Sequence, residues 1–302
     1  MASLKEIKGR INSVRNTQKI TSAMRMVATA KLRRTQTRAI QTANYARELY
    51  AILRRLQRML QSQHKLPPTQ EQRESMQHVV LIAISSNSGL CGAFNTNLYK
   101  AVQERLHFYL ERQIAVSVIP IGKKVAQHLQ RDGIETESFW VEAGERFSAN
   151  PSAETQQPLI DLLQRLNDQF LHGLLDKVEI VAPHFKSMGT QTMEVRQIVP
   201  FQVELDADSE LQEGEDEELC CDYLVEPSPQ ELYAHMLPLL QRTEFLATLL
   251  DAATAEHAAR MLAMQTADDN ATDLLQELTL IYNKTRQQTI TNELIDIMSG
   301  KA

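Results

Sequence analysis

The sequence predicts an α/β protein: long helices at the two ends pair as an antiparallel coiled coil, and a central α/β domain lies between them. All ten prolines and eight of the ten glycines lie between Pro67 and Pro238. The runs 3–62 and 239–299 therefore hold almost no helix-breaking residue. At about 1.5 Å per residue, each run makes a rod on the order of 90 Å long. A chain that leaves along one rod and returns along the other predicts a stalk.

The same distribution divides the chain into three segments. Residues 1–62 form an N-terminal coiled-coil helix, residues 63–228 the central α/β domain and residues 229–302 a C-terminal coiled-coil helix. The first segment carries 14 Lys and Arg against Glu6 and Glu48, a net charge of +12, whereas the other two carry −13 and −5. Long-range attraction favours pairing the basic helix with acidic surfaces, in this chain or in a partner. A solvated basic face is the simpler alternative.

The first helix begins with a capping box, in which Ser3 is the N-cap and Glu6 lies three residues later. A narrow apolar seam follows at helical spacing, stops at Gln18 and Thr21, and reappears on a shifted face. The change of face predicts that this helix changes neighbours along its length. The first face holds Leu4, Ile7, Ile11 and Val14, and the second holds Ile20, Met24, Val27 and Leu32.

The central segment alternates short β-branched runs with helix-length stretches, which is typical of a Rossmann-like domain with a mainly parallel sheet. An acidic stretch at 204–218 predicts a loop. The expected strands are 79–84, 114–119, a weaker one at 138–141, 178–182, 193–199 and 223–225, and the expected helices are 95–112, 123–131 and 159–171.

The return helix is expected to begin near Gln230 and to tolerate Pro238 as an early kink. Its middle is rich in alanine, which lets a second backbone approach closely, and Ala23, Ala28 and Ala30 are the alanines expected to face it. Its last part has apolar groups on more than one face, so a partner should enclose it.

The chain shows no pattern of catalytic, metal-binding or cofactor-binding residues. The glycine pair in Gly89-Leu90-Cys91-Gly92 follows a strand, but it matches neither a dinucleotide fingerprint nor a Walker loop, so a tight turn is favoured over phosphate binding. Cys91 is expected to be buried, and the eight histidines lack a His-x-x-x-His spacing. Three cysteines, two of them adjacent, favour a reducing compartment. No apolar run reaches the roughly 18 residues of a membrane span, and no signal core opens the chain, so a soluble interaction protein is expected.

Several motifs, in order along the whole chain, resemble the gamma subunit of F-type ATP synthases. The N-terminal motifs are Met1-Ala2-Ser3-Leu4-Lys5-Glu6-Ile7-Lys8 and Asn16-Thr17-Gln18-Lys19-Ile20-Thr21-Ser22-Ala23-Met24, and the central one is Gly89-Leu90-Cys91-Gly92-Ala93-Phe94-Asn95. The C-terminal motifs are Glu256-His257-Ala258-Ala259-Arg260-Met261, Tyr282-Asn283-Lys284-Thr285-Arg286-Gln287 and Ile290-Thr291-Asn292-Glu293-Leu294.

The resemblance implies a non-catalytic central-stalk rotor that couples rotation of the c-ring to conformational cycling of the catalytic beta subunits. Its implied partners are three alpha and three beta subunits, the epsilon subunit, the delta subunit of the same complex and the c-ring. The implied location is peripheral, on the cytoplasmic side of the bacterial inner membrane. No cofactor or metal is expected in the chain, because the nucleotide sites belong to alpha and beta.

The resemblance also carries over six partner-binding residues. Met24 and Arg260 match positions where the shaft meets the lower acidic loop of beta. Arg286 and Gln287 match a catch-like contact with a beta subunit, and Thr291 and Glu293 lie near it. Because exposed ion pairs contribute only roughly 0–1 kcal/mol each, steric fit is expected to carry more of the torque than salt bridges.

Three departures separate the chain from the family pattern. Ser86-Asn87-Ser88 stands where Ser-Asp-Arg is usual, Lys301 interrupts the expected Gly-Ala ending, and Cys220-Cys221 does not reproduce the chloroplast regulatory cysteine pair. The alternative hypotheses are a basic coiled-coil protein that binds nucleic acid, which steep salt dependence of binding would reveal, and a small α/β enzyme with a ligand at residues 85–95.

Overall fold

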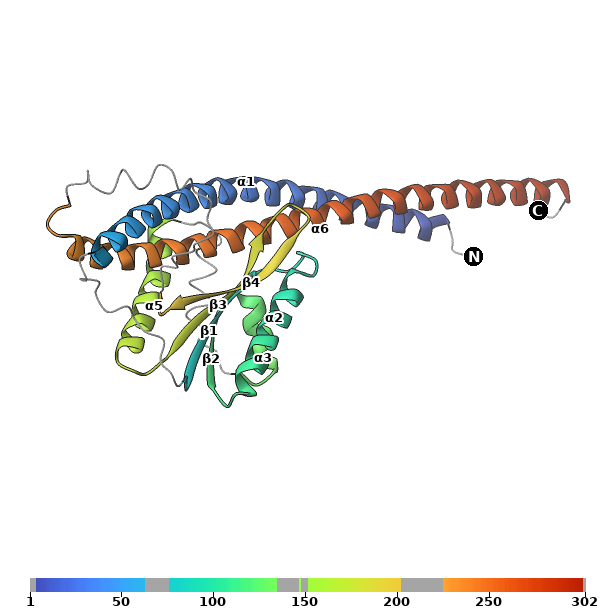
Figure 1. Cartoon of the computed structure of the whole chain (residues 1–302). Helices are drawn as coiled ribbons and strands as arrows, with labels where there is room; N and C mark the ends of the chain where they lie inside the picture. Colours follow the sequence, from blue (N-terminus) through green and yellow to red (C-terminus); the bar gives the residue numbers. More distant parts are fainter. Residues whose placement is uncertain (1–3, 63–75, 135–146, 148–151, 202–224, 301–302) are drawn as a thin grey trace.

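The computed structural model describes residues 4–62, 76–134, 147, 152–201 and 225–300. A long N-terminal helix and a longer C-terminal helix lie side by side, and a sheet with its covering helices lies against one part of the pair (Figure 1). In chain order the elements are α1 (Leu4–Ser62), β1 (His78–Ile84), α2 (Phe94–Leu110), β2 (Ala115–Ile121), α3 (Lys123–Arg131), α5 (Ala153–Leu171), β3 (Lys177–Phe185), β4 (Gln191–Val199) and α6 (Pro229–Met298).

The described strands form one sheet in the order β2-β1-β3-β4. β1 pairs in parallel with both β2 and β3, whereas β3 and β4 are antiparallel. The mainly parallel sheet predicted from the alternation of strands and helices is therefore confirmed. β1 is buried on both faces after its first residue, as a central parallel strand should be.

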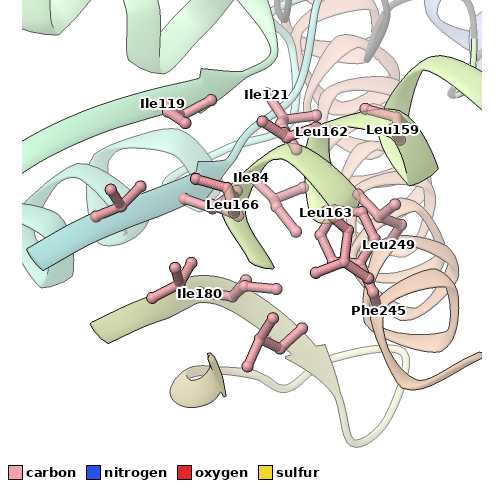
Figure 2. Packing of buried hydrophobic residues seen from close by; sticks show 14 of the residues in the cluster. Ile84, Ile119, Ile121, Leu159, Leu162, Leu163, Leu166, Ile180, Phe245 and Leu249 are labelled. Atoms are coloured by element: carbon pink, nitrogen blue, oxygen red, sulfur yellow. The ribbon is translucent and has the colours of Figure 1, made fainter. Parts of the chain in front are cut away.

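The two faces of the sheet are covered by different helices. Val80, Ile82 and Ile84 of β1 point to a core shared with α5 and α6, while Ala83 points to a core shared with α2 and α3. Figure 2 shows the first of these cores, in which Leu162 and Leu166 of α5 and Phe245 of α6 gather around the sheet residues. The sheet is thereby attached directly to α6.

α1 and α6 form an antiparallel pair, as predicted. Gln18 Nε2 donates to Thr272 Oγ1 at 2.9 Å, and Arg25 pairs with Asp268 at 3.7 Å. Towards the other end of α1, Leu53 packs in a cluster with Leu240. Residue numbers therefore rise along α1 as they fall along α6, and the two helices run in opposite directions.

The seam of α1 runs differently from the prediction. Buried or half-buried residues recur every three or four positions from Ile7 to Leu60. Gln18 and Thr21 are half-buried members of this series. Ile20 and Val27, expected to form a second apolar face, are exposed. The seam does not stop; it continues through polar positions, because Gln18 is satisfied by Thr272.

The expectation for the facing alanines is also only partly right. Ala28 is buried, whereas Ala23 and Ala30 are exposed. A helix turns by about 100° per residue, so positions five and two apart cannot share one face. On α6, Ala252, Ala255 and Ala258 are buried, but Ala252 packs in the core under the sheet and Ala255 packs against Cys91 and Phe94.

The start of α5 differs from the predicted one, whereas α6 begins within one residue of the expected Gln230. α5 begins at Ala153 rather than 159, because Ser152 and Thr155 form a capping box, and Pro158 lies inside the helix. α6 begins at Pro229, where the Ser228 hydroxyl accepts a hydrogen bond from the Glu231 backbone at 3.3 Å. The expected strand at 138–141, most of the one at 223–225, the acidic stretch at 204–218, and Cys220-Cys221 lie outside the described residues.

Candidate protein-binding surface

Arg260 lies in a buried cluster where α6 meets the turn after β1. Its Nη1 donates to Glu256 Oε1 at 2.8 Å, one helical turn earlier. Its Nη2 donates to the Ser88 carbonyl at 3.1 Å, and its Nε reaches the Gly89 carbonyl at 3.4 Å. The guanidinium therefore holds a helix and a turn that are far apart in sequence.

The turn itself is fixed from within. Asn95 at the start of α2 accepts from the Ser86 backbone at 3.2 Å and donates from Nδ2 to Cys91 Sγ at 3.1 Å. Cys91 is buried against Ala255 and Ala259 of α6, as expected for a structural thiol. Leu90 has a positive φ of 63°, so the turn projects an exposed leucine beside the coiled coil. The tight-turn prediction for these residues agrees with this geometry.

Burial governs the electrostatics of this cluster. Desolvation raises the pKa of the Glu256 carboxyl, with Arg260 opposing the shift. Desolvation also lowers the pKa of His257 to about 4, and the positive charges of Arg260 and Lys31 add to it. His257 is therefore a neutral, buried side chain at pH 7.

Met24 lies on α1 and is half-buried. Beside it, Met26 and Val27 are exposed, and a shallow groove on α1 is lined by Arg25, Met26, Thr29, Ala30 and Arg33. This stretch combines apolar side chains with arginines on a surface that this chain leaves open to solvent. Such a combination is common where one protein contacts another.

The last part of α6 extends past the beginning of α1 (Figure 1). Arg286, Gln287, Thr291 and Glu293 are all exposed there. The Thr291 hydroxyl donates to the Gln287 carbonyl at 2.9 Å, so that hydroxyl is bonded within the helix. We call residues 280–298 the tip.

The tip exposes an unusual amount of apolar surface. Leu280 is 72% exposed, Ile297 75% and Met298 87%, and Ile281, Ile290, Leu294 and Ile295 are exposed as well. At about 100° per residue, these side chains spread over more than half of the helix circumference, so no single neighbouring helix would cover them. A surface of this kind needs an enclosing partner.

The predicted site residues thus fall into two places. Met24 lies on α1 beside Arg25, which pairs with Asp268 of α6, and Arg260 lies on α6 about two turns before Asp268, whereas the other four lie on the tip. Arg260 differs from the rest, because its guanidinium is buried and bonded within the chain. Sequence reasoning missed Glu256 and His257 as its neighbours, although their spacing of four and three residues from Arg260 on a helix signals a shared environment.

No group of three or more potential metal ligands occurs in the part of the chain that the structure describes. Among the same residues, none of the helices is long and apolar enough for a membrane span.

The comparisons with known proteins cover the chain from end to end. The ATP synthase family model matches residues 3–302. The ATP synthase gamma chain of Parabacteroides distasonis is 43% identical over 302 residues, covering 100% of this chain and 99% of the relative. The chain belongs to the ATP synthase gamma-chain family. Membership confirms the resemblance drawn from the terminal motifs and lends no support to the nucleic-acid-binding alternative.

Solved structures agree on the fold of this family member. The rotor of the Euglena gracilis mitochondrial ATP synthase in rotational state 1 matches with a TM-score of 0.58 at 19% identity, covering 95% of this chain and 98% of the other. A chain of the OSCP/F1/c-ring structure of the same enzyme in rotational state 3 matches with a TM-score of 0.61 at 17% identity, covering 98% and 93%. At such low identity these matches establish the shared architecture.

Proposed function

We propose that the chain is the central-stalk rotor subunit of an F-type ATP synthase, which couples rotation of the c-ring to conformational cycling of the beta subunits. Its own surface performs no chemistry, and the catalytic nucleotide sites lie on beta. Family membership supports this function, and the structural matches to chains of rotor and F1/c-ring assemblies agree with it.

The observation that carries the proposal is the uncovered tip of α6. A helix that ends in Ile297 and Met298, 75% and 87% exposed, is unfavourable in water unless another protein surrounds it. A ring of alpha and beta subunits around the axis would enclose all sides of the tip at once. The tip residues Arg286, Gln287, Thr291 and Glu293 would then meet beta.

The rod is asymmetric, which is what a rotor requires. Its two helices differ in length and in surface, so it cannot contact three identical beta subunits in the same way. Each orientation therefore favours a different conformation in each beta subunit, and a differential contact of a few kcal/mol is enough to shift a population.

The middle of the coiled coil supplies the second contact with beta. Met24 and the exposed residues beside it are available on α1. Arg260 acts from beneath the surface, because it fixes the turn at Ser88 and Gly89. That turn, with Leu90 exposed, then faces beta at a fixed position along the axis of α6.

The three segments have separate tasks in this proposal. Residues 1–62 and 229–302 form the shaft, and residues 63–228 form a foot that meets the epsilon subunit and the c-ring. The delta subunit belongs to the same complex. The location is the cytoplasmic face of the bacterial inner membrane, held there through the other subunits.

The test is reconstitution with alpha and beta subunits. Mixed with both, the chain should enter a complex with three alpha and three beta subunits, detected by native mass spectrometry, and ATP hydrolysis should depend on the full mixture. The purified chain alone should hydrolyse no nucleotide. Elution of the chain apart from alpha and beta, or hydrolysis by the chain alone, would refute the proposal.

A matched pair of variants tests the tip. Substituting Leu280, Ile297 and Met298 by glutamine should weaken the complex, because it removes the apolar surface that the ring encloses. The control is Leu171→Gln with Leu174→Gln, two leucines that are each 65% exposed near the end of α5, far from the tip. The control should assemble as the wild type does.

A further inference from the structure

Three polar residues of α6 between positions 241 and 260 bind the α/β domain. Gln241, Asp251 and Arg260 each bind a different part of the domain. At about 1.5 Å per residue these contacts are spread over about 28 Å of the helix axis. The domain is therefore held at several positions along the axis of α6 rather than at one.

Gln241 joins α6 to α5 and to the end of β4. Its amide exchanges two hydrogen bonds with the Asn167 amide, at 2.9 and 3.0 Å. Its Nε2 also donates to the Ile198 carbonyl at 2.9 Å. Gln241 is only 5% exposed; its bond to the Ile198 carbonyl is buried, and the two bonds with Asn167 are partly buried.

Asp251 joins α6 to the end of β3. His184 Nδ1 lies 2.6 Å from Asp251 Oδ2, and the Phe185 backbone donates to Asp251 Oδ1 at 3.3 Å. His184 Nε2 also lies 3.9 Å from Glu194 on β4. One carboxylate on the helix thus holds the edge where β3 leads into β4.

Apolar residues fill the space between the polar contacts. Phe245 and Leu249 pack on the sheet and α5 (Figure 2), and Ala255 and Ala259 pack on the turn that Arg260 binds. Apolar packing opposes separation but has no preferred direction. Hydrogen bonds weaken steeply when they are bent, so they oppose rotation of the domain about the helix.

We propose that Gln241, Asp251 and Arg260 are positioning residues that lock the α/β domain to α6 and carry torque between the domain and the coiled coil. The inference rests on the proposed rotor function. In this proposal α6 receives the torque from the α/β domain, and α1 rotates with α6 because the two helices are paired.

Loss of the hydrogen bonds of one positioning residue should first increase local opening of the segment that this residue binds. Removing the acceptor of a partly buried hydrogen bond, which contributes about 1 kcal/mol, raises the population of the open state by about 5-fold. In Asp251→Leu, the Phe185 amide loses its acceptor, so its hydrogen exchange should accelerate by about that factor. The measurement is hydrogen–deuterium exchange on the assembled complex.

The functional test uses the complete complex in inverted membrane vesicles. The variants are Gln241→Met and Asp251→Leu, which remove the polar groups, keep roughly the length of each side chain and lie away from the surfaces that meet beta. The controls are the same substitutions at exposed positions of α5, Gln164→Met and Asp168→Leu. Ions transported per ATP hydrolysed are measured while the opposing ion gradient is raised.

At low load, both lock variants should transport ions as well as the wild type does. At high load their ratio of transport to hydrolysis should fall, and it should fall further in the double variant, because a weaker lock slips under torque. A purely structural role would reduce the amount of active complex and leave the ratio unchanged at every load. Ratios equal to those of the controls at all loads would overturn the proposal.

The two proposals fail separately. If the wild-type chain does not enter a complex with alpha and beta, the rotor function itself is wrong. If the wild-type complex forms and transports ions, and the lock variants assemble and keep full coupling under load, only the lock is wrong. If Asp251→Leu does not assemble, exchange at Phe185 in the full-length chain alone decides, because unchanged protection there would refute the lock.

Discussion

The middle of α6 and its tip belong to one helix, but the side chains of the middle are buried within this chain and those of the tip are not. Between 241 and 260, apolar side chains are buried and the polar groups Gln241, Asp251 and Arg260 find partners within the chain. Between 280 and 298, equally apolar side chains are exposed. The contrast shows that folding of this chain fixes the middle, whereas only assembly can fix the tip.

The largest expected effect of a single substitution contrasts the two regions directly. Phe245→Ala, at a fully buried position, should lower the free energy of unfolding by about 3–5 kcal/mol, because it leaves a cavity between α6 and the sheet. Leu280→Ala, at a position 72% exposed, should change it by less than about 0.5 kcal/mol. Denaturant unfolding of the full chain measures both, and similar values would remove the contrast.

Arg260→Met should lower the free energy of unfolding by about 3 kcal/mol or more, because it leaves the Glu256 carboxyl buried without its cation. The double variant Glu256→Leu with Arg260→Met removes both charges and should recover most of the loss. A double variant no more stable than Arg260→Met would show that the bonds to Ser88 and Gly89, rather than the ion pair, stabilise the cluster.

His257 should make stability depend on pH. Its folded-state pKa of about 4 lies below the ordinary value of 6.5, so folding favours the neutral ring. That stabilisation is fully present above pH 6.5 and is lost as the pH falls through 4, a change of about 3 kcal/mol. Arg260 and Lys31 act in the same direction as burial, whereas the raised pKa of Glu256 contributes with the opposite sign.

The comparison with His257→Gln isolates this contribution. Chemical denaturation at a series of pH values should give a flatter profile between pH 6.5 and 4 in the variant than in the wild type. Parallel profiles would show that His257 is not buried as a neutral ring.

The smallest effect concerns the basic face of α1. Neutralising Arg33, Arg34 and Arg38 together should leave coupled rotation intact, because exposed ion pairs contribute roughly 0–1 kcal/mol each and steric fit carries the torque. Single-molecule rotation of the assembled complex checks this. Loss of coupled rotation with assembly intact would reverse the ranking of steric fit over charge.

The sequence predicted the large features of the fold because they depend on strong local signals. Proline and glycine placement predicted the two long helices, and the apolar run at 79–84 predicted a strand that is buried on both faces in the structure. α3 was predicted at its observed bounds, Lys123–Arg131, because Asp132-Gly133 closes it. These features need no knowledge of distant contacts.

The predictions that were wrong depended on tertiary partners. The seam of α1 was expected to end at Gln18, because a polar residue at a seam position cannot be told from a surface one until its partner, Thr272, is known. Ile20 and Val27 were expected on a second apolar face of the helix, yet they are exposed, where the proposed function places other subunits. The partner-binding residues on the tip remain predictions for the same reason.

The polar residues proposed to lock the domain to α6 could not have been located from sequence alone, although one signal existed. Gln241 and Asp251 are polar residues among apolar neighbours such as Leu240 and Leu250, which marks them as unusual. What they bind, Asn167, Ile198 and His184, lies 43 to 74 residues away along the chain. Only the packing of the sheet against α6 brings these groups together.

The uncovered end of α6 also constrains how a cell can produce this chain. Before assembly, a newly synthesised copy exposes the leucine- and isoleucine-rich tip, through which copies of the chain can aggregate. Synthesis in step with the surrounding subunits would keep that interval short. Overproduced by itself, the chain should precipitate, and producing it together with alpha and beta should keep it in solution.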